Sequence, residues 1–239
     1  MMTGQGAPSA MLEDNLDLIA VGWFLLTIVG YRLVAEWGPL EHRSIVTAVQ
    51  QQRVAWMRNM AVRDNRTLDG ILLGTLSQGN AFFASTSAIA IGGLTAMMGS
   101  GERVQTLLER LPYVAKAPPA IGEVKVLLLT ATFIYAFFKF AWAFRLSHYT
   151  AIMIGSTPVV PPGSDASHCD DHVKLTAKLI GIAAEHTNSG LRSFYYAIAA
   201  LAWFFHPLLF IAATTWVMGI LIRRDFFSRS LRILSAAKT

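Results

Sequence analysis

Four polar side chains interrupt the long apolar stretches of the sequence: Gln78, Asn80, Lys139 and His206. A charged side chain near the middle of a membrane helix costs about 2.5–3.5 kcal/mol on insertion scales, and such residues commonly mark ion or substrate paths. With a rise of about 1.5 Å per helical residue, all four are expected in the same half of the bilayer. There they would form a polar vestibule for a solute or an ion.

Lys139 is the one cation far from the ends of these stretches, and three roles are open to it. It can extend to the headgroups beside Arg145, contact an anion or a substrate in a polar cavity, or pair with a carboxylate. Beyond the first turn of each stretch there is no Asp or Glu. The candidate partners nearest in depth are therefore Asp69 and Glu36, at the ends of such stretches.

His206 directly precedes Pro207. A proline in a helix cannot donate its backbone hydrogen bond, so the carbonyl of Trp203 is left free. The imidazole can satisfy that carbonyl, which is the structural role we expect, or it can relay protons or gate a ligand. His206 is the only histidine well inside a span, so haem ligation, or any other cofactor, is not expected.

A second group of reactive side chains lies outside the apolar stretches, in the run from Ser167 to His172. His168, Cys169 and His172 are candidate metal ligands, because thiolate and imidazole suit transition metals and residues four apart share a helix face. The alternative, which we expect, is that Asp170 or Asp171 caps the following helix while its neighbours are solvated.

Membrane helices must position these residues, because four stretches are long enough to cross a bilayer. A spanning helix needs about 20 apolar residues, and the stretches comprise residues 16–34, 71–98, 126–146 and 194–222. The chain of 239 residues is 54% hydrophobic and 15% charged, and its single cysteine excludes an internal disulfide. We therefore predict an all-α polytopic membrane protein, a four-helix transmembrane bundle with interfacial helices.

The domain organisation follows from these spans. Residues 1–15 are expected to be a polar N-terminal tail, residues 16–224 the four-span membrane domain, and residues 225–239 a basic C-terminal tail. Amphipathic periodicity predicts a helix after Ser44, lying in the membrane surface or packed on the bundle, and another after Asp170 or Asp171. The fourth span is expected to be one helix bent at Pro207.

Small residues recur every four positions in the second span and form one smooth stripe. Such stripes let membrane helices approach closely. We expect this stripe to pack within the chain, with a subunit interface as the alternative. Its members are Ala84, Ala88, Gly92 and Ala96.

The orientation is decided by the first span. No Lys or Arg precedes it, whereas a strongly basic loop follows it, so the N-terminus is expected outside. Four spans would then place the C-terminus outside as well. The basic C-terminal tail argues the other way.

Three runs of sequence resemble the membrane-protein family catalogued as domain of unknown function 599. They are residues 80–87 (NAFFASTS), residues 135–145 (YAFFKFAWAFR), and residues 190–196 (GLRSFYY) leading to residues 202–204 (AWF). The resemblance covers most of the chain. It implies a multi-pass bacterial membrane protein, hence the cytoplasmic (inner) membrane, and carries no assigned activity or catalytic residue.

Two classes of function remain. The protein moves or gates a small solute or ion through a polar vestibule in one half of the membrane, or it is a non-catalytic scaffold or accessory subunit that binds partner helices. Its partners are then the lipid bilayer and either a second copy or another membrane protein. We do not expect an enzyme, because no nucleophile–base pair or acidic metal site occurs in the sequence, nor do we expect nucleic-acid binding.

Overall fold

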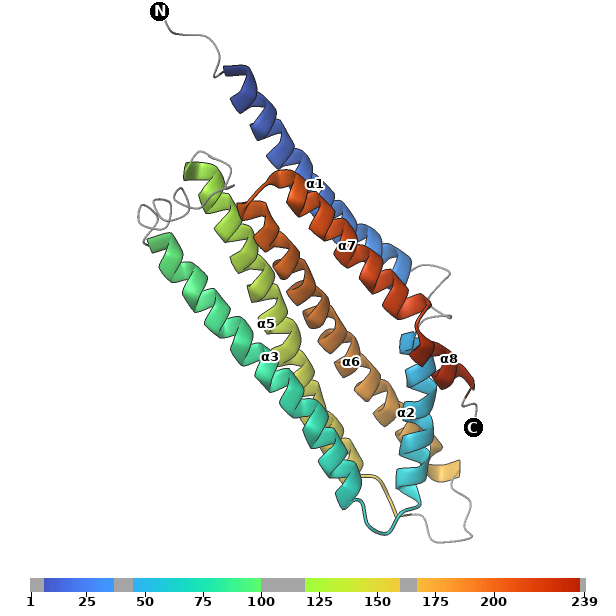
Figure 1. Cartoon of the computed structure of the whole chain (residues 1–239). Helices are drawn as coiled ribbons and strands as arrows, with labels where there is room; N and C mark the ends of the chain where they lie inside the picture. The colour runs from blue at the N-terminus through green and yellow to red at the C-terminus, as the bar shows by residue number, and fades with distance from the viewer. Residues whose placement is uncertain (1–6, 37–44, 100–118, 160–166, 237–239) are drawn as a thin grey trace, which may run out of the picture.

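The computed structural model describes residues 7–36, 45–99, 119–159 and 167–236, and these ranges are almost entirely helical. The elements in chain order are α1 (Ala7–Glu36), α2 (Ile45–Ala61), α3 (Thr67–Gly99), α5 (Pro119–Gly155), α6 (Ser167–Leu201), the 3-10 turn η2 (Ala202–Phe204), α7 (Pro207–Phe226) and α8 (Arg229–Ala236). Figure 1 shows α1, α3, α5, α6 and α7 side by side in one bundle. We call the end where α3 ends and α5 begins the upper end.

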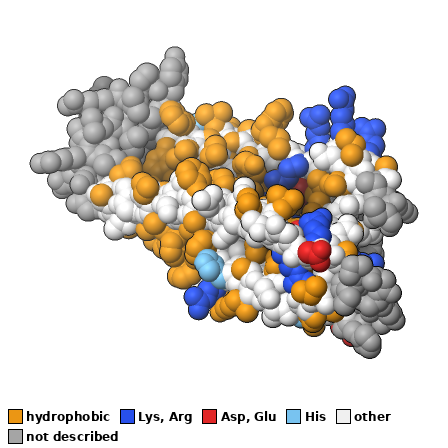
Figure 2. Space-filling model, turned by 90° about the horizontal axis from the view of Figure 1, so that it is seen from below, with side chains coloured by type: hydrophobic (Ala, Val, Ile, Leu, Met, Phe, Trp, Pro, Cys, Tyr) orange, Lys and Arg blue, Asp and Glu red, His pale blue; other side chains and the backbone are white. Residues whose placement is uncertain are grey.

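The predicted class, an all-α polytopic membrane protein, is confirmed. Four helical segments are long and apolar enough to cross a membrane, namely Asn15–Leu33, Thr67–Met98, Ala120–Gly155 and Pro207–Ala236. Large apolar side chains on them point outward: Ile89 is 76% exposed and Trp216 is 74% exposed. Apolar side chains also cover much of the face seen in Figure 2. Such a surface suits contact with lipid tails.

The prediction that residues 194–222 form one bent helix is wrong. α6 runs from Ser167 to Leu201, η2 follows, and α7 begins anew at Pro207. His206, between them, has an extended backbone (φ −160°, ψ 140°), so the chain reverses direction instead of bending. Pro207 is therefore the first residue of a helix, where its missing N–H costs nothing. Residues 194–201 end the long amphipathic helix α6, which lies in the bundle as a fifth long helix (Figure 1).

This reversal also changes the relation between the two ends of the bundle. α1 begins at the upper end, whereas α7 ends toward the lower end, near α8 (Figure 1). The sequence predicted both termini on one side of the membrane, whereas in the structure α1 begins and α7 ends at different ends of the bundle. α1 begins at Ala7, so part of the predicted N-terminal tail is helical, and α8 lies within the predicted basic tail.

Two apolar cores hold the helices together. The upper core joins α1, α5, α6 and α7 around three aromatic rings. The ring of Phe210 lies between those of Phe24 and Trp203, with 5.1 Å between centroids in each pair. The lower core joins the helix predicted after Ser44, now α2, to α6 through Met57 and Met60, both fully buried. Of the two alternatives for α2, the structure thus shows packing on the bundle.

The small-residue stripe of α3 does not pack within the described chain. α3 contacts chiefly α5, through Phe83 and the fully buried Ser87. The stripe residues Ala88, Gly92 and Ala96 are exposed, and Ala84 is half-buried. Among the described residues, the structure therefore shows no helix packed on this stripe.

Candidate functional site

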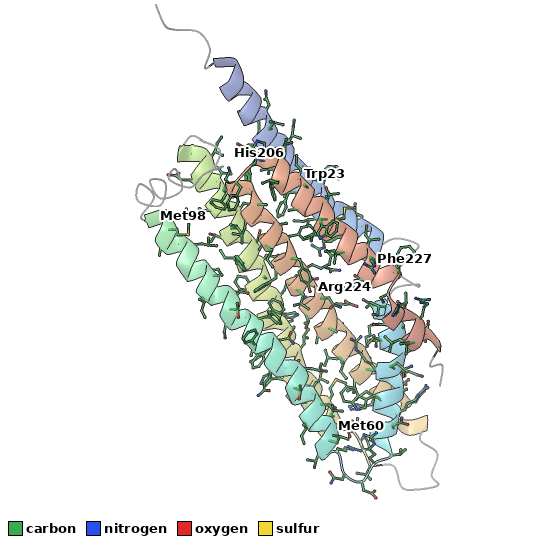
Figure 3. The ribbon with its side chains drawn as sticks, in the orientation of Figure 1. Trp23, Met60, Met98, His206, Arg224 and Phe227 are labelled. Atoms are coloured by element: carbon green, nitrogen blue, oxygen red, sulfur yellow. The ribbon has the colours of Figure 1, made fainter. Side chains whose placement is uncertain are left out.

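The four predicted intramembrane polar residues do not gather in one place. Asn80 is buried at 4% exposure, whereas Gln78, two residues away, lies exposed on the outer side of α3. Figure 3 shows His206 at the upper end of the bundle, level with Met98 and far from Met60 at the lower end. The reason is the chain reversal: α7 starts at the upper end of the bundle, whereas α3 starts at the lower end, so His206 lies far from Asn80.

Lys139 faces α6, and its partner there is a histidine. Its ammonium lies 3.5 Å from Nδ1 of His186 and 5.3 Å from the ring centroid of Tyr135. The side chain is half-buried, and no carboxylate of the described residues forms a salt bridge with it. Neither Asp69 nor any other described acid is thus its partner.

Asn80 lines a cavity of about 390 Å³ in the lower half of the bundle. Its walls come from α2 and α3, with Val49 on one side and Leu73 and Leu76 on the other, and its floor comes from α5 and α6. Leu76 is 55% exposed, so the cavity reaches the outside of the bundle. This volume is within the range of small-molecule sites.

Two carboxamides in this cavity have unused hydrogen-bonding groups. The side-chain oxygen of Asn80 accepts a hydrogen bond from Thr187 (2.7 Å), and no described residue accepts from its amide nitrogen. Asn188, on the next position of α6, makes no side-chain hydrogen bond with the described residues. Buried or half-buried polar groups normally have partners, so both groups are available to a bound solute.

Charged side chains stand at the edges of the cavity, on its α2 and α7 sides. Arg53 comes from α2, while Arg224 and Asp225 come from the end of α7 (Figure 3 labels Arg224). Asp225 accepts hydrogen bonds from Arg224 (Nε, 2.7 Å) and from the Tyr31 hydroxyl. Burial lowers the pKa of Arg53, but a guanidinium keeps its charge in proteins. These edges therefore carry two cations, each with an acid close by: Asp225 at Arg224 and Glu185 near Arg53.

Three aromatic rings pack on one another above Asn80, toward the upper end of the bundle. Phe83, one turn above Asn80 on α3, stacks on Phe140 of α5 at 5.1 Å between ring centroids. Phe194 of α6 meets both rings edge-on, at 5.6 and 5.8 Å. The polar lower half is thus separated from the upper half by an apolar constriction.

At the upper end, a second polar group surrounds the reversal of the chain. The ammonium of Lys125 donates to the carbonyl of Trp203 (3.0 Å), and the Trp203 indole donates to Asp17 (2.5 Å). The free carbonyl expected at Trp203 therefore does find a donor, but the donor is Lys125. His206 instead accepts a hydrogen bond from Leu208 N (3.1 Å) and caps α7.

The candidate metal ligands in α6 are drawn apart. Cys169 is buried in the lower core, and His172 is 2.9 Å from the Met153 carbonyl of α5. The side chain of His168 lies outside the described residues. Within the described part of the chain, no group of three or more metal-ligating side chains occurs. Asp170 lies in the first turn of α6 and pairs with Lys174 and Arg58 instead of capping the helix.

Several residues of the site were not predicted from the sequence: Arg53, Thr187, Asn188, Arg224 and Asp225. Thr187 and Asn188 follow the start of the helix predicted after Asp170 or Asp171 but were placed outside the bundle, although the amphipathic periodicity of α6 runs from Val173 through Ala177 to Ile180 and beyond. Extending that period to Leu201 would have placed both on a bundle helix. No local signal identifies Arg53 or Arg224, because only the tertiary fold brings them together.

Comparisons with known proteins agree with this architecture and add no activity. No curated protein and no solved structure matches the chain. One family model matches residues 19–230, which include all five long helices in whole or in large part. The chain therefore belongs to the family described as "Protein of unknown function, DUF599".

Proposed function

We propose that the protein binds a small solute bearing a carboxylate or phosphate in the lower cavity and gates its movement across the membrane. One observation carries the proposal: the amide nitrogen of Asn80, the carboxamide of Asn188 and two arginines converge on one cavity, and aromatic rings pack above it. Carboxamide N–H groups and guanidinium groups are donors that suit oxyanions. The proposal assigns no catalytic step.

The aromatic constriction supports gating more than an open channel. The stacked pair Phe83 and Phe140 lies between Asn80 and the upper half, so passage of a solute would require these rings to move. Hydrophobic constrictions of this kind gate by excluding water. With the N-terminus outside, as the sequence predicts, the cavity lies on the cytoplasmic side.

The test measures uptake of radiolabelled inorganic phosphate, succinate and glycine into liposomes that contain the protein. We expect at least one probe to enter faster than into protein-free liposomes, and both Asn80→Leu and Asn188→Leu to reduce that rate. Asn80→Leu leaves no orphaned hydroxyl, because Thr187 can then donate its single proton to the Ala183 carbonyl (3.0 Å). Gln78→Leu is the matched control, since Gln78 is exposed on the same helix. No faster uptake of any probe, or equal uptake by Asn80→Leu and wild type, would overturn the proposal.

A scaffold that binds partner helices is the second candidate, and the outward face of α3 favours it. Ala88, Gly92 and Ala96 are exposed beside Ile89, and α3 packs chiefly on α5. Ala88→Leu and Gly92→Leu in one variant should then weaken self-association or partner binding, as measured by cross-linking in membranes. Unchanged cross-linking would remove this alternative.

A further inference from the structure

A second groove, distinct from the solute cavity, lies between α1 and α5 over α6. Its volume is about 260 Å³. Its upper part is apolar, with Leu25, Ile28 and Leu128, whereas its lower part holds Arg32, Arg192 and Ser189. Along α1, Leu25 and Arg32 are seven residues apart, so the groove is roughly 10 Å long. Polarity thus changes from apolar to cationic along its length.

We infer that this groove binds an anionic phospholipid, with an acyl chain against the apolar part and the phosphate at Arg32 and Arg192. Leu25 is 50% exposed at the edge of the groove, so an acyl chain can enter from the surrounding bilayer. Arg32 lies at the end of the apolar segment Asn15–Leu33, which is the depth of lipid headgroups, and Arg192 lies beside it over the ring of Tyr31. The groove therefore matches a phospholipid in polarity, direction and depth.

The charge at the lower end selects an anionic lipid over a neutral one. Arg192 lies over the ring of Tyr31 at 5.3 Å and donates to Ser189 (2.9 Å), which fixes its position without removing its charge. Lys139 adds a third cation next to the groove, over the ring of the lining residue Tyr135. Basic pockets between membrane helices bind anionic headgroups for this reason.

Asp225, on the neighbouring helix α7, does not cancel the positive charge of Arg32 and Arg192. Asp225 accepts from the Tyr31 hydroxyl, but it is already paired with Arg224 at 2.7 Å. Glu185 lies one turn below Ser189 on α6 and is exposed. Among the described residues, the cations Arg32, Arg192 and Lys139 thus stand against Glu185 and the already paired Asp225.

Tyr196 lines the groove one turn above Arg192 and is 3% exposed, and its hydroxyl lies close to the hydroxyl of Thr27 on α1. The ester carbonyls of a phospholipid lie just inside its phosphate, at the depth of these two hydroxyls.

The experiment compares lipid binding to the full chain in detergent by native mass spectrometry, with phosphatidylglycerol, phosphatidylcholine and sn-glycerol 3-phosphate as probes. We expect wild type to retain one phosphatidylglycerol in preference to phosphatidylcholine, and glycerol phosphate not to displace it. Arg32→Gln/Arg192→Gln should weaken phosphatidylglycerol binding about thirtyfold, since each cation near a membrane surface contributes about fivefold. Arg223→Gln is the control, because Arg223 is exposed at the end of α7.

A second variant tests the apolar part without changing any charge. Ala131 lines the groove and is exposed, so Ala131→Trp fills the space of the acyl chain and should abolish the retention of phosphatidylglycerol. Ala212→Trp, on the outer side of α7, is the control and should not change this retention. Equal retention of both phospholipids by wild type, or unchanged phosphatidylglycerol binding by both variants, would overturn the inference. Displacement by glycerol phosphate would show a site for a soluble phosphate and would likewise overturn it. These results do not depend on solute uptake, so the two proposals fail separately.

Discussion

The ammonium of Lys125 on α5 donates a hydrogen bond to the main-chain carbonyl of Trp203 at 3.0 Å, across the bundle and at the point where the chain reverses. In a continuous helix this carbonyl would accept from residue 207, but Pro207 has no N–H. Lys125 also lies 5.3 Å from the centroid of the Trp203 ring, whose indole donates to Asp17. Three helices are thus tied together at one turn.

Lys125→Met should destabilise the protein through this tie. The substitution keeps the length of the side chain but leaves the buried Trp203 carbonyl without a donor, which costs about 1.5–3 kcal/mol for a bond to a charged group. We expect a lower midpoint of thermal unfolding in detergent. Lys178→Met is the matched control, because Lys178 is exposed on α6. Equal unfolding midpoints for the two variants would contradict the structural role of Lys125.

The chain reversal can be tested by chemical labelling in membranes. In a Cys169→Ser background, His206→Cys and Phe227→Cys place single thiols at the opposite ends of α7 (Figure 3). The structure predicts that a membrane-impermeant maleimide labels the two positions from opposite sides. One bent helix over residues 194–222 would instead keep position 206 inside the bilayer and unlabelled. The absence of labelling at position 206 would therefore contradict the reversal.

The sequence predicted the membrane class because long apolar runs are a local property. It missed the reversal because residues 194–201 and 207–222 are both apolar, and an apolar composition does not indicate in which direction a helix crosses the membrane. Pro207 fits both a bent helix and a new helix start. What decides between them is tertiary: Lys125 and Asp17, from two other helices, satisfy Trp203.

The same reasoning applies to the candidate site. Asn80 could be predicted, because one amide in an apolar stretch stands out, and it does line a cavity. Gln78 stood out equally, but only the packing of α3 on α5 shows that it faces away. Asn188 and Arg224 could not be identified, since neither lies within an apolar run and each becomes part of a site only through the fold.

Asp69 at the start of α3 should be essential to the lower end of the bundle. It is fully buried, and one of its oxygens accepts from the indole of Trp56 (2.7 Å) and from Arg63 (2.8 Å). Asp69→Asn loses the negative charge that both donors share, and we expect a loss of about 1–3 kcal/mol of stability. The unfolding midpoint of Asp64→Asn should stay near wild type, because Asp64 is exposed in the same turn. A lower unfolding midpoint for Asp64→Asn than for Asp69→Asn would show that the buried carboxylate does not stabilise the lower end of the bundle.

Gly190 gives the sharpest test of the aromatic constriction. A Cβ atom at this position would lie 2.6–2.8 Å from three carbons of the Phe140 ring, which is held by Phe83 and Phe194. Gly190→Ala should therefore destabilise the protein by about 1–3 kcal/mol of overpacking, partly offset by the gain of about 1 kcal/mol when alanine replaces glycine in a helix.

Gly181→Ala on the same helix provides the comparison. Its Cβ atom would meet the carboxamide oxygen of Gln50, which is the far end of a flexible side chain and can move. We expect Gly181→Ala to be close to neutral in thermal unfolding. Adding Phe140→Leu to Gly190→Ala should recover part of the lost stability, because the smaller side chain vacates the space that the new methyl group needs. Strictly additive effects of these two substitutions would mean that residues 140 and 190 are not in contact, since contacting residues are coupled.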